Sequence, residues 1–368
     1  MIRAHKIRLY PNNAQVTYFT KACGVARFSY NWALSKAKER YELDKTLRFN
    51  EALLRKELNA IKRELFPWML EVTKCASQLA IKDGLGKAFR NFFAGRAGFP
   101  KYRRKGVNDS FSLSNDQYKI IGATVRVPSL GFVRLAEGLR YDGKQLGATI
   151  SRTADKWFVS VHVELPDKLI SASENQAVGV DLGIKNLATL SDGELVTGAK
   201  VSRQCEKKLR RLNQSLSRKV GAKKGEKKSA NFIKTRKQIS RLYARMANIR
   251  ADETHKLTSM LIQSYGLIGI EDLNVKGMMS NHKLARSVAD MSFFEFRRQL
   301  EYKSEIAGVK VIVTDMWFPS SKMCSTCGFI AEEMPLSLRE WTCEHCNSNH
   351  DRDINSAINL RNYALESV

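Results

Sequence analysis

The chain lacks the apolar segments that a membrane protein or a secreted protein needs. No stretch of its 368 residues approaches an uninterrupted apolar run of about 18 residues, the length that predicts a transmembrane helix. The N-terminal segment MIRAHKIRLY has no apolar core of the kind found in signal peptides. We therefore expect a cytoplasmic protein that binds no membrane.

Acidic residues are scarce relative to basic ones. The chain has 62 Lys and Arg against 37 Asp and Glu, a formal net charge of +25. This charge exceeds what solubility requires and indicates a polyanionic partner, most simply a nucleic acid. A ribosomal or chromatin-like binder without catalytic chemistry would explain the charge equally well. With 43% hydrophobic residues, the chain is long enough for two or more domains.

Cysteine is sparse outside one window. Three of the seven cysteines are isolated and are expected to be reduced and inert; these are Cys23, Cys75 and Cys205. The other four form two Cys-x2-Cys pairs separated by 15 residues: Cys324, Cys327, Cys343 and Cys346. Two such pairs supply the four tetrahedral ligands that Zn²⁺ prefers, and Gly328 suits a knuckle turn. We predict a purely structural zinc, which needs neither His345 nor His350.

Periodicity divides the first half of the chain. Residues 2–10 alternate like a strand, and helical spacing follows over 13–44, after Asn50, and over 72–93. Beyond residue 106 the period becomes two, in short strands broken by Gly, Pro and Asn-Asp. These strands predict a small antiparallel β-barrel formed by 1–13 and 101–170, with 14–100 as a helical insertion and a linker at 167–176.

The second half has the pattern of an α/β domain with a mixed sheet. Its predicted order is two strands, helices, a strand at 267–270, a helix, a strand at 309–315 and a closing helix. Residues 201–250 hold 17 Lys and Arg against two Glu, on two helices around the loop 221–229. This run is either a solvated face or a phosphate-binding surface. A further helix is expected at 252–266. We predict a domain of 177–320 and 348–368, interrupted by a zinc ribbon at 321–347.

Three acidic residues are notable for their positions. Asp181 follows the apolar strand AVGV, Glu271 follows LIGI, and Asp353 lies in the first turn of the closing helix. Each has a simple alternative role, in a turn, at a strand end or at a helix N-terminus. If they converge, their repulsion requires hard divalent cations with oxygen ligands, Mg²⁺ or Mn²⁺. Two such ions about 4 Å apart support phosphodiester hydrolysis.

The order of these motifs resembles a known family. DLGIKNLATLSDG, GIEDLNVKGM, and PSSKMCSTCG with CEHC and HDRDINSAINL resemble the three RuvC-like (RNase H-fold) nuclease motifs and zinc ribbon of the TnpB family. These proteins are RNA-guided DNA endonucleases of insertion sequences, related to compact type V CRISPR effectors. IRAHKIRLYPNNAQ, YNWAL, KAFRNFF and FPKYRRKG resemble the family's N-terminal half.

The resemblance assigns the catalytic, metal-binding acids to Asp181, Glu271 and Asp353. Asp351 competes for the third place, but Asp353 occupies the family position in DINSA, where serine replaces the more usual alanine at 356. Asn355 either orients the site or serves only the helix start. Since Asp353 follows the last predicted zinc ligand by seven residues, we expect Cys343→Ser to impair cleavage indirectly.

The resemblance also implies partners. These are a guide RNA from the element's own locus and double-stranded target DNA, bound by a monomeric ribonucleoprotein in a bacterial or archaeal cytoplasm and at the nucleoid when on target. The barrel, as the family's wedge domain, and the helical recognition insertion would read a short adjacent motif through Lys74 and Gln78, whose side chains suit guanine and adenine edges; an exposed polar face is the alternative. Tyr30, Trp32 and Tyr102 are candidates for base stacking, although Trp32 fits core packing better.

Two other function classes remain open from the sequence. An RNA-guided DNA-binding repressor without cleavage would have the same charge and fold, but the three acids argue against it. A DNA transposase needs an acidic triad for strand transfer, and the order Asp, Glu, ribbon, Asp favours the nuclease.

Overall fold

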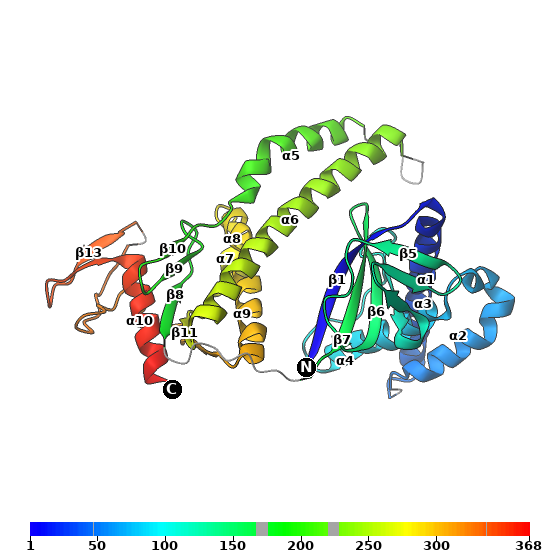
Figure 1. Ribbon diagram of the computed structural model, residues 1–368, viewed down its shortest axis with the longest axis horizontal. Coiled ribbons are helices and arrows are strands. Elements are labelled where there is room, and N and C mark those ends of the chain that lie inside the picture. The colour runs from blue at the N-terminus through cyan, green and yellow to red at the C-terminus, as the bar shows by residue number, and fades with distance from the viewer. Residues whose placement is uncertain (47, 167–175, 220–227, 336) are drawn as a thin grey trace. The chain divides into compact units, whose positions relative to one another are not determined.

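The chain forms two compact units, Met1–Asp167 and Lys168–Val368. The computed structural model describes residues 1–46, 48–166, 176–219, 228–335 and 337–368 (Figure 1). Except for Gln176, the predicted linker at 167–176 lies outside the described residues, as does the predicted loop at 221–229 up to residue 227. Within the described residues, no helix has the length and apolar character that a membrane crossing requires. The finer division into four domains stays a prediction.

The first unit contains a seven-stranded antiparallel sheet with the N-terminal strand near its middle. Along β1 the inward-facing residues alternate, so that His5, Ile7 and Leu9 are buried. The sheet order is β2-β6-β7-β1-β5-β4-β3. The strands are β1 (Ile2–Tyr10), β2 (Ser110–Ser114), β3 (Lys119–Ile121), β4 (Thr124–Val127), β5 (Gly131–Leu135), β6 (Lys144–Thr153) and β7 (Lys156–Glu164).

The described strands of this unit form an open sheet, so the closed barrel predicted from the sequence is not found. β1 pairs with β7 from Ile2 to Leu9 but with β5 only at Leu9 and Tyr10. β2 and β3 are the two edges of the sheet. Strands β3, β4 and β5 have only 3, 4 and 5 residues, which gives them few ladder hydrogen bonds with which to curl the sheet into a ring.

Helices inserted between β1 and β2 pack against this sheet, as predicted. They are α1 (Asn13–Leu43), α2 (Glu51–Leu65), the 3₁₀ turn η1 (Pro67–Glu71), α3 (Lys74–Leu79) and α4 (Gly86–Phe93). Asn12 and Gln15 form a capping box that begins α1. The side chain of Asn50 caps α2 by accepting a hydrogen bond from the amide of Leu53.

The single helix predicted over 72–93 is wrong. A wide π-type turn, η2 (Ala80–Leu85), separates α3 from α4. A Cβ atom on Gly84 would lie 2.9 Å from Nη2 of Arg103, and the Arg103 guanidinium lies 4.0 Å from the centre of the Tyr30 ring. The wide turn thus accommodates an arginine that covers Tyr30.

The second unit contains the predicted mixed sheet. Its order is β10-β9-β8-β11-β12. β8, β11 and β12 run parallel, and β9 and β10 are antiparallel to their neighbours. The hairpin between β9 and β10 turns at Gly193, whose φ of 93° favours glycine. The strands are β8 (Ala177–Asp181), β9 (Ala188–Leu190), β10 (Leu195–Val196), β11 (Leu267–Ile270) and β12 (Lys310–Val313).

The closing helix α10 (Arg352–Glu366) lies directly on β8 and β11 (Figure 1). A Cβ atom on Gly179 would fall 1.8 Å from the carbonyl oxygen of Ala357, and one on Gly269 would fall 2.2 Å from that of Leu360. The two glycines face each other across the strand pair. Backbone therefore packs against backbone at this contact, which leaves no room for a side chain.

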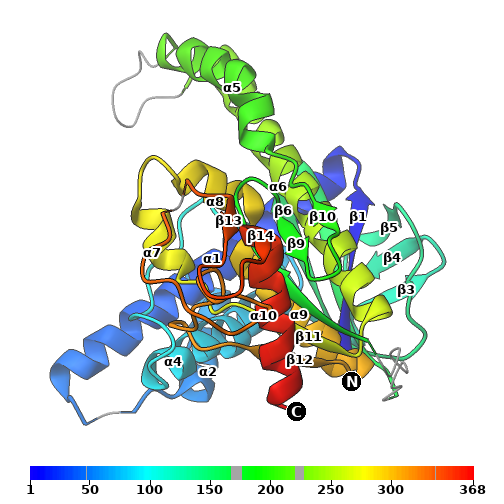
Figure 2. The same ribbon diagram turned by 90° about the vertical axis from the view of Figure 1, so that its left-hand side faces the viewer.

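The opposite face of the sheet is covered by α6 (Ala230–Ser264) and α9 (Phe293–Ala307), whose Leu257, Leu261 and Phe296 share a core with Val178 and Ile268. The helix predicted separately at 252–266 is the end of α6, since no Gly or Pro interrupts 230–264. With α5 (Val201–Ser217), α6 forms an extended two-helix arm (Figure 2). The short helices α7 (Val275–Ser280) and α8 (Ala285–Met291) follow β11, and β13 (Glu340–Thr342) pairs with β14 (Asn349–Asp351) ahead of α10.

Candidate functional site

The three acidic residues singled out in the sequence lie at one end of the mixed sheet. Asp181 ends β8, Glu271 directly follows β11, and Asp353 lies in the first turn of α10. Each strand acid stands two residues after a glycine that faces α10. Because strand side chains alternate with a period of two, Asp181 and Glu271 face the same helix as the glycines.

Ser356 of α10 connects two of the acids. Its buried Oγ donates a hydrogen bond to Oδ1 of Asp181 at 2.9 Å and lies 3.3 Å from Oε1 of Glu271. A second hydroxyl, that of Ser320, donates to the same Glu271 oxygen at 2.8 Å. From the sequence, Ser356 was notable only as a replacement for alanine, and Ser320 was not identified. For Ser356 the available signal was its place one helical turn after Asp353.

The charge of Asp181 is strongly disfavoured by its surroundings. Burial raises the pKa of Asp181 well above its usual value, and the negative charge of Glu271 adds to this effect. The hydrogen bond from Ser356 lowers the pKa of Asp181, whereas the negative charge of Asp353 raises it by a smaller amount. Repulsion among neighbouring carboxylates is the condition that a bound divalent cation relieves.

Asp353 and Asp351 have different roles in the structure. Asp351 is the N-cap of α10, since its Oδ1 accepts hydrogen bonds from the amides of Asp353 and Ile354 at 2.9 and 3.0 Å. The carboxylate of Asp353 instead accepts two hydrogen bonds from Nη1 of Arg339, at 2.9 and 3.0 Å. Arg339 was not identified from the sequence. The helix cap occupies the carboxylate of Asp351, whereas the carboxylate of Asp353 is bound by Arg339.

The donor set fits hard divalent cations. Asp181, Glu271 and Asp353 offer carboxylate oxygens, which Mg²⁺ and Mn²⁺ prefer. Among the described residues, the four cysteines form the potential metal-binding group whose donor atoms all lie within 4.8 Å of one another. The three acids are less tightly grouped.

The four cysteine thiols form one cluster, with all four sulfur atoms within 4.8 Å of one another. Sγ of Cys324 lies 3.6 Å from that of Cys346, and Sγ of Cys327 lies 3.7 Å from that of Cys343. Zinc–sulfur bonds of about 2.3 Å in a tetrahedron require sulfur separations of about 3.8 Å, so the cluster has the size of a zinc site.

Matching backbone turns place the cysteines, and one histidine supports them. Gly328 and Asn347 follow the two pairs with φ of 77° and 56°, so asparagine does in the second knuckle what glycine does in the first. Of the two spare histidines, His350 places Nε2 3.1 Å from Sγ of Cys324, whereas His345 stacks on Phe329. His350 thus contacts a ligand without belonging to the cluster.

Two asparagines attach this ribbon to α10. Asn355 donates to the carbonyl of Met323 at 2.8 Å and accepts from the amide of Ser325 at 2.9 Å. Asn359 donates to the carbonyls of Ser320 and Met323 at 2.8 and 2.6 Å. Both side chains are buried. The ribbon therefore holds the helix that carries Asp353.

The two residues predicted to read a DNA motif lie on α3 in the first unit. Lys74 is exposed and Gln78 is half-buried, one helical turn away. Hydrogen bonds from Ser114 and Gln117 lower the pKa of Asp116, and the positive charge of Lys74 adds a smaller effect in the same direction. Lys74 therefore lies near the turn that carries Asp116. DNA contact by Lys74 and Gln78 stays a prediction.

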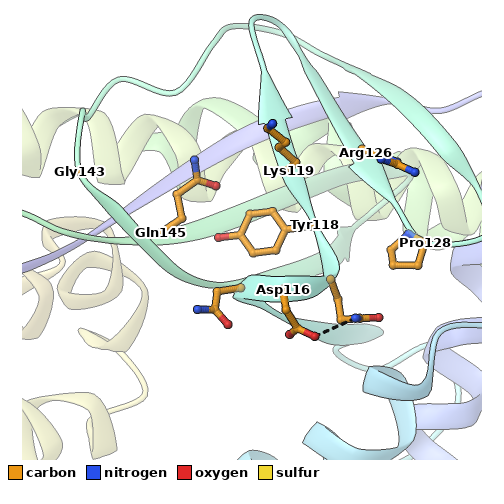
Figure 3. Close-up of a pocket in the computed structure, with 9 residues that line it drawn as sticks. Asp116, Tyr118, Lys119, Arg126, Pro128, Gly143 and Gln145 are labelled. Carbon is orange, nitrogen blue, oxygen red and sulfur yellow. Dashed lines mark hydrogen bonds between the residues drawn. The ribbon is translucent and has the colours of Figure 1, made fainter.

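The turn next to Lys74, η3 (Asn115–Gln117), lines a cavity of about 640 Å³ (Figure 3). Tyr118, Arg126 and Gln145 contribute to its wall. The Tyr118 hydroxyl is buried without a hydrogen-bond partner among the described residues, and burial raises the pKa of Tyr118 to about 12. The cavity is polar and lies in the unit predicted to read the motif.

Of the aromatic residues proposed to stack on bases, only Tyr102 is exposed. Tyr30 is buried beneath Arg103, and Trp32 packs against the core. Tyr102 is 48% exposed and has the Lys38 ammonium 4.9 Å from its ring centre.

Three family models match the chain. The IS605 OrfB model, described as "Probable transposase", matches residues 160–282, and the "Cas12f1-like, TNB domain" model matches 293–360, which includes the cysteine cluster. A "Helix-turn-helix domain" model of the same OrfB group matches residues 1–46. In this chain those residues form β1 and α1.

Related proteins match along nearly the whole chain. A protein of Streptomyces pristinaespiralis named "Putative RNA-guided DNA endonuclease" is 36% identical over 97% of this chain and 88% of its own length. InsQ of Escherichia coli K12, which has the same description, is 31% identical over 98% of this chain and 91% of its own length. The Cas12f1 chain of a Cas12f1–sgRNA–target DNA complex shares the fold, with a TM-score of 0.58 at 12% identity and 98% coverage of both chains.

We expect Asp181→Asn to stabilise the protein in buffer with no added Mg²⁺ or Mn²⁺. Because folding raises the pKa of Asp181, folding disfavours its charged form, a cost that is absent at low pH and grows as the pH rises past the unfolded-state pKa. The amide removes this cost. Tm should rise by about 2–4 °C per kcal/mol relieved in a unit of this size, more at about pH 8 than at about pH 4. Asp142→Asn on the exposed surface is the control, and an unchanged Tm at high pH would contradict the expectation.

We expect the purified protein to contain one zinc ion per chain and Cys343→Ser to lose it. Three remaining thiolates bind zinc less tightly than four, and the ribbon depends on the metal for its folding. Elemental analysis gives the zinc content, and thermal melting should show a lower Tm for the variant. Cys205 lies on α5, outside the cluster, so Cys205→Ser should keep the metal. Zinc-free wild-type protein would contradict the assignment.

Proposed function

The chain belongs to the TnpB/IS605 OrfB family, and from this premise we propose that it is an RNA-guided DNA endonuclease that cuts target DNA next to a short adjacent motif. The observation that carries the proposal is the Ser356 hydroxyl between the carboxylates of Asp181 and Glu271, with the negative charge of Asp353 near enough to help raise the pKa of Asp181. The names of two full-length relatives give the same activity.

In this proposal the unit from residue 177 onward is a RuvC-like nuclease domain with a zinc ribbon inserted before its last helix. Asp181, Glu271 and Asp353 would hold two Mg²⁺ or Mn²⁺ ions. When bound, such ions act as Lewis acids on the phosphodiester and make water a better nucleophile at neutral pH.

The remaining residues of the site orient these acids. Ser356 and Ser320 fix the carboxylates of Asp181 and Glu271 by hydrogen bonds, which limits the rearrangement that metal binding requires. Arg339 holds the carboxylate of Asp353 in place. The zinc ribbon takes no part in the chemistry and positions α10 through Asn355 and Asn359.

The partners proposed are a guide RNA and double-stranded target DNA. The net charge of +25 supports a polyanionic partner, and the structural relative Cas12f1 is part of a complex with an sgRNA and target DNA. The basic arm of α5 and α6 would contact phosphates. The open sheet and helices of the first unit would read the adjacent motif through Lys74 and Gln78, in a monomeric ribonucleoprotein.

A repressor without cleavage is the second candidate, since it would retain the charge and the fold. The intact acids and the two hydroxyls that orient them favour hydrolysis, because a protein that only binds would not need three carboxylates that repel one another.

We expect Asp181→Ala and Asp353→Asn to abolish guided cleavage of motif-bearing DNA in Mg²⁺ while guide-RNA binding persists. Asp351→Asn is the matched control, because asparagine caps a helix about as well as aspartate. This variant should keep cutting. Cleavage is followed on labelled duplex DNA, and RNA binding by gel shift. Activity in Asp181→Ala, or its loss in Asp351→Asn alone, would refute the assigned roles.

We expect Ser356→Ala to reduce the cleavage rate at limiting Mg²⁺ by about 10- to 100-fold, the usual effect of losing a group that orients a metal ligand. Alanine favours the helix, so the loss would not come from unfolding of α10. Raising Mg²⁺ should recover part of the rate. Ser367→Ala, after the end of the same helix, should behave as wild type. An unaltered Mg²⁺ dependence in Ser356→Ala would show that the hydroxyl does not orient the acids.

A further inference from the structure

The loop between β12 and the zinc ribbon exposes a large aromatic side chain near the acidic site. Trp317 is 84% exposed, and its neighbour Met316 is 52% exposed. Among the described residues no other aromatic side chain is as exposed. Neither the hydrolytic site nor the ribbon uses this indole.

The backbone beneath Trp317 is well anchored. The Trp317 amide donates to Oδ1 of Asp315 at 2.8 Å, and the amide of Phe318 donates to the Asp315 carbonyl at 3.1 Å. The Phe318 ring packs on Tyr363 of α10 with ring centres 4.8 Å apart. Phe318 therefore fixes the loop to the helix, while the aromatic residue directly before it, Trp317, is exposed to solvent.

Three residues further on, the same loop contacts the acids. Ser320 donates to Glu271 at 2.8 Å, and its carbonyl accepts a hydrogen bond from Asn359 at 2.8 Å. Three residues of chain span at most about 11 Å, the length of about three stacked nucleotides at about 3.4 Å each. A strand whose phosphate lies at Glu271 would thus bring a neighbouring base within reach of the indole.

Taking the proposed function as its basis, we propose that Trp317 is a stacking platform for an unpaired base of the DNA strand that enters the acidic site. Every base offers a π face, so stacking positions a strand without reading its sequence. This suits a nuclease whose target is chosen by base pairing with an RNA. The base must be unpaired and unstacked on one side, so the platform selects single-stranded DNA. Trp317 is a substrate-positioning residue here, and the acids carry the chemistry.

The test uses the full-length protein without guide RNA, in buffer with no added Mg²⁺ or Mn²⁺, and measures its affinity for a short oligothymidine over a salt series. Trp317→Ala should weaken binding by about 5- to 150-fold, which corresponds to the 1–3 kcal/mol of one stacked base. The salt dependence should not change, because no phosphate contact is lost. Trp317→Phe should restore most of the affinity. Phe294→Ala, which removes a 70% exposed aromatic on α9, is the matched control and should have no effect.

The guided reaction gives a second readout. In the ribonucleoprotein, Trp317→Ala should raise KM for a single-stranded target with little change in kcat. Unchanged affinity and KM in this variant would overturn the inference. So would a lower Tm with unchanged DNA binding, because the indole would then pack against protein. If wild-type protein shows no guided cleavage, the proposed function fails. The oligothymidine-binding measurement still decides whether Trp317 binds single-stranded DNA.

Discussion

The direct contact between the backbone of α10 and the two central strands determines the geometry of the site. Gly179 and Gly269 are paired across β8 and β11, and each carries a helix carbonyl where its Cβ would be. Any side chain at either position would push the helix off the sheet. Ser356 immediately precedes Ala357, whose carbonyl contacts Gly179. A substitution of Gly179 that displaced the helix would therefore also move the Ser356 hydroxyl away from Asp181, even with all three acids intact.

The electrostatics of the site oppose folding, and the surrounding contacts hold it together. Two neighbouring carboxylates at the end of a sheet repel each other, and burial adds to the cost of their charge. Contacts on both faces of the sheet oppose this cost. Apolar residues of α6 and α9 pack on one face. On the other face lies α10, with the Ser356 hydroxyl and the attached cysteine ribbon. The site is assembled by parts of the chain that are far apart in sequence, which gives it a defined shape before any cation arrives.

The parts of this arrangement that were predictable from the sequence are those with a local signal. The cysteine spacing, the strand-end acids and the helix cap at Asn50 each depend on a few neighbouring residues. The glycine two residues before each acid was also visible, but its meaning required knowledge of which helix lies on that face. Arg339 gave no signal, because its partner is determined by the path of the ribbon.

The errors have similar causes. The closure of the first sheet depends on how non-local strands pair, which alternation does not encode. The break in 72–93 serves Arg103, a residue of the following segment. The helix predicted separately at 252–266 is the end of α6, because nothing in 230–264 interrupts that helix. The four-domain division and the reading of DNA by Lys74 and Gln78 are predictions that need the nucleic acids themselves.

The attachment of the cysteine cluster to α10 links two kinds of coordination chemistry. Redox conditions do not alter carboxylates or hard cations, whereas thiolates can be oxidised. Cys327 is exposed, and oxidation of a zinc-binding thiolate releases the metal and loosens the ribbon. Through Asn355 and Asn359 that damage reaches the helix bearing Asp353. The proposed hydrolytic centre, which has no redox-active group of its own, would in this way become vulnerable to oxidative stress.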